Sequence, residues 1–224
     1  TTDVFELLDR TEQNLFGVAE GNIRKSFDKI ENLIHSAVQN IEDAASKGSG
    51  VTGMETGFAE LDKLTAGWQP SDLIILAARP GMGKTAFVLS MARNAAVEFG
   101  RAVAVFSLEM SSIQLVNRLI ASETELSADK LKRGKLEKFE WEQLHSKIGR
   151  LSEAPLFIDD TPGLSVFELR AKCRRLKQQH NIEMVIIDYL QLMTVGGDGK
   201  GNREQEISTI SRSIKSIAKE LEIP

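Results

Sequence analysis

The sequence predicts an α/β fold in which a mostly parallel sheet is flanked by helices and preceded by a helical arm. Two patterns carry this prediction. From residue 54 onward, uninterrupted apolar runs of strand length alternate with stretches of helical length, as is typical of a parallel sheet that is buried on both faces. Before residue 46, apolar residues recur at the spacing of helices.

Two helices are predicted in the segment that precedes the sheet. The first covers residues 1–21 and has an apolar face at Val4, Leu7, Leu8 and Leu15, and the Gly21-Asn22 pair ends it. The second carries a near-heptad apolar stripe from Ile23 to Ala44. Residues 46–53 (SKGSGVTG) predict a flexible joint. Two alternatives stay open here, because the helices either pack on their own chain or dock on another subunit.

The chain therefore divides into a docking arm at residues 1–21, a second helix with its joint at 22–53, and a core at 54–224. Strands are expected within the core at residues 73–77 (LIILA), 102–107, 155–158 and 184–187. Helices are expected between and after them, at residues 86–99, 112–123, 130–151, 166–180 and 204–222.

Composition sets limits on the function class. The formal net charge is −4, so a broad basic face for duplex DNA is disfavoured, and any nucleic-acid contact should be confined to a loop or a pore. The single cysteine, Cys173, excludes an intrachain disulfide, fits a cytoplasmic protein and is expected to be a small buried residue. No stretch approaches the roughly 20 apolar residues of a membrane span, and the start does not resemble a signal peptide.

Residues 78–85 (ARPGMGKT) carry a phosphate-binding loop, which follows a predicted strand and opens a predicted helix. Gly81 and Gly83 allow backbone N–H groups to point at an anion, Lys84 reaches the β- and γ-phosphates of ATP, and the Thr85 hydroxyl can hold Mg²⁺. Ala78 departs from the motif, which opens with glycine. The residues expected to line the nucleotide are Ala78, Arg79, Pro80, Gly81, Met82, Gly83, Lys84, Thr85 and Ala86.

Two carboxylates complete the predicted ATP site. Asp188 ends the apolar run MVIID and should reach the carboxyl edge of the sheet, where it would hold Mg²⁺ together with Thr85. Glu109 follows the strand at 102–107 and is the candidate to activate water, although it could equally be a glutamate that complements a helix start. Asp159 and Asp160 end another strand and are rivals for the same task.

Together these motifs resemble the DnaB-type replicative helicases. The similar segments are ARPGMGKT, SLEM at residues 107–110, MVIIDYLQLM at 184–193, TGFAELDKLTAGW at 56–68 and NREQEI at 202–207. The resemblance implies a RecA-like ATPase in a hexameric ring that moves along single-stranded DNA, with Glu109 activating water and Lys84, Thr85 and Asp188 binding MgATP. A primase and a helicase loader are further implied partners.

The resemblance also implies that the helix at residues 3–19 docks on a neighbouring subunit and that residues 194–203 (TVGGDGKGNR) face the central channel. Lys200 and Arg203 are then candidates to contact DNA phosphates, and the alternative is a surface connection with no such contact. The family's domain continues past Pro224 into a strand with a γ-phosphate sensor and an arginine that acts in trans. Slow ATP hydrolysis is therefore expected of these 224 residues by themselves.

Two other functions share these motifs. One is a RecA-like recombinase or repair ATPase, in which the nucleotide switches a DNA-binding filament, and the other is a nucleotide-gated ring module that binds partners. The predicted helices before residue 53 favour the helicase, because they match its linker.

Overall fold

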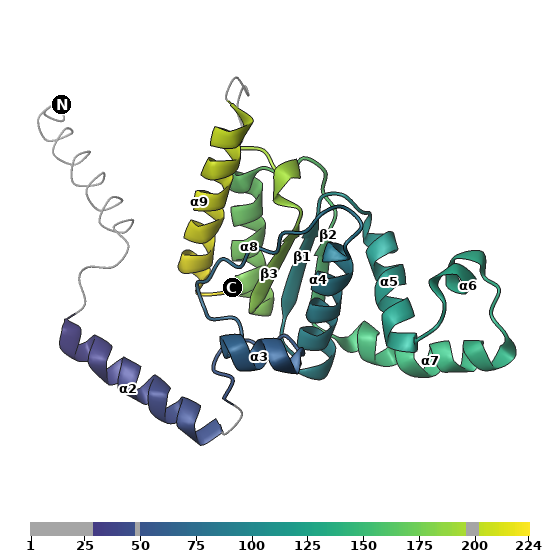
Figure 1. Ribbon diagram of the computed structural model, residues 1–224, viewed down its shortest axis with the longest axis horizontal. Helices are drawn as coiled ribbons and strands as arrows, with labels where there is room; N and C mark the ends of the chain where they lie inside the picture. Colours follow the sequence, from purple (N-terminus) through teal and green to yellow (C-terminus); the bar gives the residue numbers. More distant parts are fainter. Residues whose placement is uncertain (1–28, 48–49, 196–201) are drawn as a thin grey trace, which may run out of the picture. The chain divides into compact units, whose positions relative to one another are not determined.

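The computed structural model describes residues 29–47, 50–195 and 202–224 (Figure 1). The chain divides into two units, and the boundary in the sequence falls between Gly48 and Ser49. In the first unit, the predicted second helix is present as α2, Ile30–Lys47. The predicted first helix and its face of Val4, Leu7, Leu8 and Leu15 lie outside the described residues.

Helix α2 carries an exposed apolar stripe. Large apolar side chains recur along it at intervals of one to four residues, and each is about half exposed or more: Ile30, Leu33, Ile34, Val38 and Ile41. Apolar residues at such spacing lie on one side of a helix. A stripe of this kind is suited to packing against another apolar surface.

Three parallel strands form the sheet of the second unit. These are β1 (Val103–Ser107), β2 (Leu156–Asp159) and β3 (Met184–Asp188), in the order β2-β1-β3. The register aligns Ser107 with Asp188 and Phe106 with Asp159, so the carboxyl ends of all three strands meet at one edge. Figure 1 shows the strands side by side at the centre of this unit. Three of the four predicted strands are thus confirmed.

Helices cover both faces of the sheet, as the sequence predicts (Figure 1). On one face, Val103 and Val105 pack with residues of α4 (Lys84–Arg93) and α5 (Ser112–Thr124). On the other, Ala104 and Phe106 pack with residues of α8 (Val166–His180) and α9 (Arg203–Leu221). Successive side chains of a strand point to opposite faces, so β1 contributes to both cores.

The predicted helix at residues 130–151 is wrong, because two helices occupy this region. Helix α6 (Ala128–Arg133) ends at Gly134, whose φ of +65° places it in the left-handed region that favours glycine and stops helices. Helix α7 (Lys138–Glu153) then begins after Glu137, which forms a capping box with Glu140. Within the described residues, the remaining helices are α3 (Ala59–Thr65), the π-helical turn η1 (Asn94–Glu98) that extends α4, and the short η2 (Leu190–Leu192).

The predicted strand at residues 73–77 is absent from the described structure. Ile74 and Ile75 are exposed, and none of β1, β2 and β3 pairs with this segment. The physical reason is that a strand requires a neighbour that exchanges backbone hydrogen bonds with it. At the open edge of β3, the Val185 N–H donates to the Pro224 carbonyl (3.1 Å), so the residues after α9 lie there instead.

Cys173 confirms its predicted place in the core. It lies on the buried face of α8 and is fully buried, and burial, together with the nearby charge of Asp159, raises the pKa of its thiol to about 12. Among the helices that the structure describes, each is too short or too polar to cross a membrane.

Candidate nucleotide-binding site

The phosphate loop lies at the amino-terminal end of α4. Gly81 (φ +78°) and Gly83 (φ +86°) both adopt the left-handed backbone that side chains disfavour. Gly83 precedes the first turn of α4, and no side chain caps that turn. The first N–H groups of a helix lack partners within the helix, so this end of α4 is suited to bind an anion.

Lys84 lies directly at this helix start. Its ammonium donates a hydrogen bond to the carbonyl of Ala78 (3.0 Å), which is the first residue of the motif. The lysine side chain therefore folds back across the loop. A positive charge and a row of backbone N–H groups together provide the chemistry that binds a phosphate.

Thr85 and Asp188 meet in space although 103 residues separate them in sequence. The Thr85 hydroxyl donates to Oδ2 of Asp188 at 2.7 Å, which joins the phosphate loop to the end of β3. Asp188 is nearly buried, with 9% of its surface exposed. Two hard oxygen atoms at this separation suit Mg²⁺, which binds oxygen ligands and keeps several waters or phosphate oxygens.

Glu109 lies at the same edge of the sheet. The residue before it, Leu108, donates its backbone N–H to the Asp188 carbonyl (2.8 Å). The residue after it, Met110, accepts a hydrogen bond from the Ser107 hydroxyl at 2.7 Å and returns one from its own N–H at 3.2 Å. Glu109 is itself exposed. The backbone on both sides is thus fixed next to Asp188 while the carboxylate faces solvent.

The rival carboxylates have structural partners. Asp159 accepts hydrogen bonds from the Lys172 ammonium (2.6 Å) and from the Thr161 backbone N–H (2.9 Å). Burial opposes ionisation of Asp159, but these donors outweigh it and hold its pKa below the usual value. The Ser112 N–H donates to Asp160 at 2.7 Å, which also lowers the pKa of that carboxyl. Both groups are held as ionised acceptors.

We expect Asp159→Asn to lower stability and to leave ATP hydrolysis within about twofold of the parent rate, because Asp159 bonds Lys172 and not the phosphate loop. The expected loss is about 1–3 kcal/mol of unfolding free energy at pH 7. A lowered folded-state pKa stabilises above the unfolded value near 3.8, so the difference between variant and parent should shrink as the pH falls below it. Thermal melts and steady-state ATPase assays measure both. Loss of hydrolysis in a folded variant would contradict the choice of Glu109.

The predicted DNA-contacting residues are only partly described. Lys200 lies outside the described residues. Arg203 is the first residue of α9, and its guanidinium bonds the carbonyl of Gln191 and the carboxylate of Glu206. Thr194, at the other end of this loop, pairs with Ser165 through an isolated β-bridge. Arg203 therefore lies at the base of the loop.

The segment at residues 56–68 makes contacts that its sequence does not predict residue by residue. In the structure, Asp62 is buried and accepts hydrogen bonds from the Thr56 backbone N–H (2.9 Å) and hydroxyl (2.7 Å). Phe58 stacks on Phe87 of α4 with ring centroids 4.8 Å apart. The signal in the sequence is the Thr-Gly pair followed by an aspartate in the first turn of the next helix. This segment packs directly on the helix that follows the phosphate loop.

Comparison with known proteins places this chain in a family. The family model described as the DnaB-like helicase C-terminal domain matches residues 53–224. The chain belongs to this family. The replicative DNA helicase DnaC of Bacillus subtilis is 46% identical over 222 residues, which cover 99% of this chain and 49% of that protein.

Solved structures agree with this membership. One solved ATPase domain has a TM-score of 0.82 and 34% identity, over 88% of this chain and 69% of that one. A DnaB-like replicative helicase, solved in a study of its interactions with primase, has a TM-score of 0.76 and 32% identity, over 96% of this chain and 51% of that one. The RecA-like fold expected for a DnaB-type chain is thereby confirmed. The chain spans about half the length of the curated relatives it matches.

Proposed function

We propose that this chain is the motor of a replicative DNA helicase, which couples ATP hydrolysis to movement along single-stranded DNA and to duplex unwinding. The observation that carries the proposal is the 2.7 Å hydrogen bond between Thr85 and Asp188. It brings the end of the phosphate loop to the acidic end of β3, which is the arrangement that binds a nucleotide with its metal ion. Membership of the DnaB-like helicase family supports a helicase motor over other ATP-driven motors.

Each residue of the site has a part in this proposal. The N–H groups at the start of α4 and the Lys84 ammonium bind the β- and γ-phosphates of ATP. Thr85 and Asp188 hold Mg²⁺, which when bound neutralises charge on the phosphate oxygens. Their side-chain oxygens are already neighbours in the structure, so the pair fits such an ion.

Glu109 acts as the general base in this scheme. Its carboxylate accepts a proton from the water that attacks the γ-phosphate, as a positioned carboxylate can do. The backbone bond from Leu108 to Asp188 sets its distance from the metal-binding pair. Its exposure is consistent with a group that has to meet water and substrate.

The motor is proposed to act as a hexameric ring. The arm at residues 1–21, with its apolar face of Val4, Leu7, Leu8 and Leu15, is proposed to dock on the next subunit, and such a head-to-tail contact closes into a ring when the rotation between subunits allows it. For the whole natural protein, a primase and a helicase loader are the proposed partners. One related structure is of a DnaB-like helicase studied with primase, which supports the first of them.

Deleting residues 1–21 should give a folded protein that binds nucleotide as a monomer, because the proposed arm then lacks its apolar face of Val4, Leu7 and Leu8. Analytical ultracentrifugation with and without nucleotide measures the oligomer. A variant with Leu7 and Leu8 replaced by serine changes only that face and should lose the oligomer as the deletion does. An unchanged oligomer after the deletion would mean that residues 1–21 do not hold the ring.

The loop at residues 194–203 is proposed to contact the phosphates of a single strand. Replacing Lys200 and Arg203 with alanine should weaken DNA binding and flatten its dependence on salt, by a slope of about 0.7 for each lost phosphate contact. Because Arg203 also bonds Gln191, Lys200→Ala is measured separately to isolate the contact from the anchoring of the loop. If all variants bound DNA with the affinity and the salt dependence of the parent, the loop would be a surface connection that does not contact DNA.

Electron microscopy of the whole natural protein with a non-hydrolysable ATP analogue tests the proposed function. A closed ring of six subunits, with ATPase activity that single-stranded DNA stimulates, is the expected result. An open helical filament would favour the recombinase alternative. A ring that neither binds DNA nor responds to it would favour a partner-binding module.

A further inference from the structure

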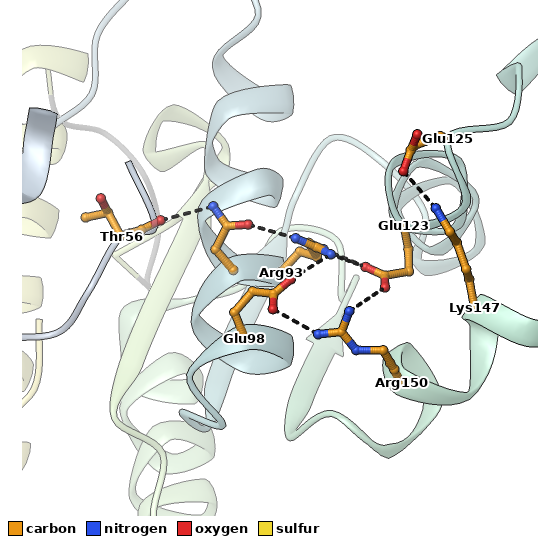
Figure 2. A network of polar contacts seen from close by, with 8 residues as sticks. Thr56, Arg93, Glu98, Glu123, Glu125, Lys147 and Arg150 are labelled. Carbon is orange, nitrogen blue, oxygen red and sulfur yellow. Dashed lines mark hydrogen bonds and ion pairs between the residues drawn. The ribbon is translucent and has the colours of Figure 1, made fainter. Parts of the chain in front are cut away.

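Two helices of the core start at the candidate site, and an ion pair connects their far ends. Helix α4 begins with Lys84 and Thr85, and α5 begins at Ser112, three residues after Glu109. At the opposite ends of these helices, Arg93 is the last residue of α4 and Glu123 is the penultimate residue of α5. Figure 2 shows the side chains of Arg93 and Glu123 pointing toward one another.

The contact between these two residues joins two guanidinium nitrogens to one buried carboxylate oxygen. Arg93 approaches the same Glu123 oxygen, Oε2, with its Nε at 2.6 Å and with an Nη atom at 2.5 Å. The Glu123 side chain is 3% exposed and the Arg93 side chain is 20% exposed. A planar guanidinium that donates from Nε and brings a second nitrogen to the same oxygen restricts both distance and orientation.

Two further charged residues surround this pair, and the four side chains together carry no net charge. Arg150 of α7 lies 3.6 Å from Glu123 and donates to Glu98 at 2.8 Å, and Glu98 also pairs with Arg93 at 2.9 Å. Two arginines therefore face two glutamates (Figure 2). A buried ion pair is weak evidence for stability, because desolvation of the charges offsets much of their attraction. Its fixed geometry is the more informative property.

The same arginine reaches the segment that packs on α4. An Nη atom of Arg93 donates to the Asn94 side chain (3.1 Å), whose amide donates to the Thr56 carbonyl (3.3 Å). A Cβ atom at Gly57 would lie 2.5 Å from Asn94, so glycine is required at this approach. Arg93 thus connects the end of α4 to α5 and, through Asn94, to the segment at 56–68.

We propose that Arg93 and Glu123 are positioning residues for ATP hydrolysis, which set the angle between α4 and α5 and so the placement of Glu109 relative to Lys84 and Thr85. This rests on the proposed function. Thr85 and Arg93 lie eight residues apart on α4, which is a length of about 12 Å. If α4 rotated by about 10° about its Arg93 end, the phosphate loop at its other end would move by about 2 Å. Errors of about 1 Å in an active site can lower a rate about 100-fold.

Glu123→Gln in the whole natural protein tests this inference, because the amide keeps the shape and removes the charge that orients Arg93. The expected result is a kcat at least about tenfold lower, with the equilibrium dissociation constant for a fluorescent ATP analogue within about twofold of the parent. Glu125→Gln is the matched control. Glu125 pairs with Lys147 at 2.7 Å, so it joins α5 to α7 rather than to α4, and both constants should stay unchanged.

Thermal melts of Glu123→Gln and of a second variant separate positioning from stability. Lost stability alone lowers the melting temperature and the folded fraction but leaves the kcat per folded molecule unchanged, whereas lost positioning lowers that kcat. Arg93→Lys keeps the positive charge but replaces the planar guanidinium with a single ammonium. It serves as the test variant if Glu123→Gln does not fold. A parent-like kcat, or a fall in nucleotide affinity that matches the fall in kcat, would overturn the inference. Turnover that survives Lys84→Ala would instead overturn the proposed function.

Discussion

Lys84→Ala should reduce ATP hydrolysis by at least about 100- to 1,000-fold, because the transferring phosphoryl group loses its main positive partner as charge develops on it. Steady-state turnover at saturating MgATP in the whole natural protein measures this effect. The melting temperature should change little, since the described bond of the Lys84 ammonium is a single one to the Ala78 carbonyl on the exposed loop.

A lysine outside the site provides the control for Lys84. Lys63 lies on α3, is largely exposed and pairs with Glu60 at 2.7 Å, so Lys63→Ala removes an equal charge without touching the loop. Turnover of this control should match the parent. Parent-like turnover in Lys84→Ala would remove the basis for the whole nucleotide site.

Glu109→Gln should bind MgATP with parent affinity and lose at least about 100-fold in turnover, because the amide preserves the shape of the side chain but cannot accept the proton of the attacking water. Single-turnover hydrolysis and equilibrium binding of a fluorescent ATP analogue separate the two quantities. Normal hydrolysis in Glu109→Gln, together with failure of an Asp159 or Asp160 variant, would move the general base to one of those residues.

Asp188→Asn should behave differently from Glu109→Gln. Its carboxylate lies 2.7 Å from the Thr85 hydroxyl, so its loss should weaken the part of nucleotide binding that depends on Mg²⁺. Titration of the analogue with and without Mg²⁺ measures that part. Equal dependence on Mg²⁺ in Asp188→Asn and the parent would exclude Asp188 as a metal ligand.

The local sequence pattern was sufficient to predict those strands and helices whose position depends on hydrophobic periodicity and on turn residues. The runs that became β1, β2 and β3 are apolar and bounded by polar residues, and their helices carry one apolar stripe each. The same reasoning failed at residues 73–77, where an equally apolar run lies unpaired and exposed. It failed again at Gly134, where one left-handed residue ends α6 inside an otherwise helical pattern.

The sequence by itself determined the parallel α/β class, the phosphate-loop motif with Lys84 and Thr85, and the acidic strand end at Asp188, because each depends on residues that are close together in the chain. Only the tertiary structure decided that Thr85 and Asp188 touch, that Asp159 and Asp160 are bound by Lys172 and Ser112, and that Arg93 meets Glu123. These are contacts between distant segments. Such pairings depend on how the strands order themselves and how the helices pack, which no local periodicity specifies.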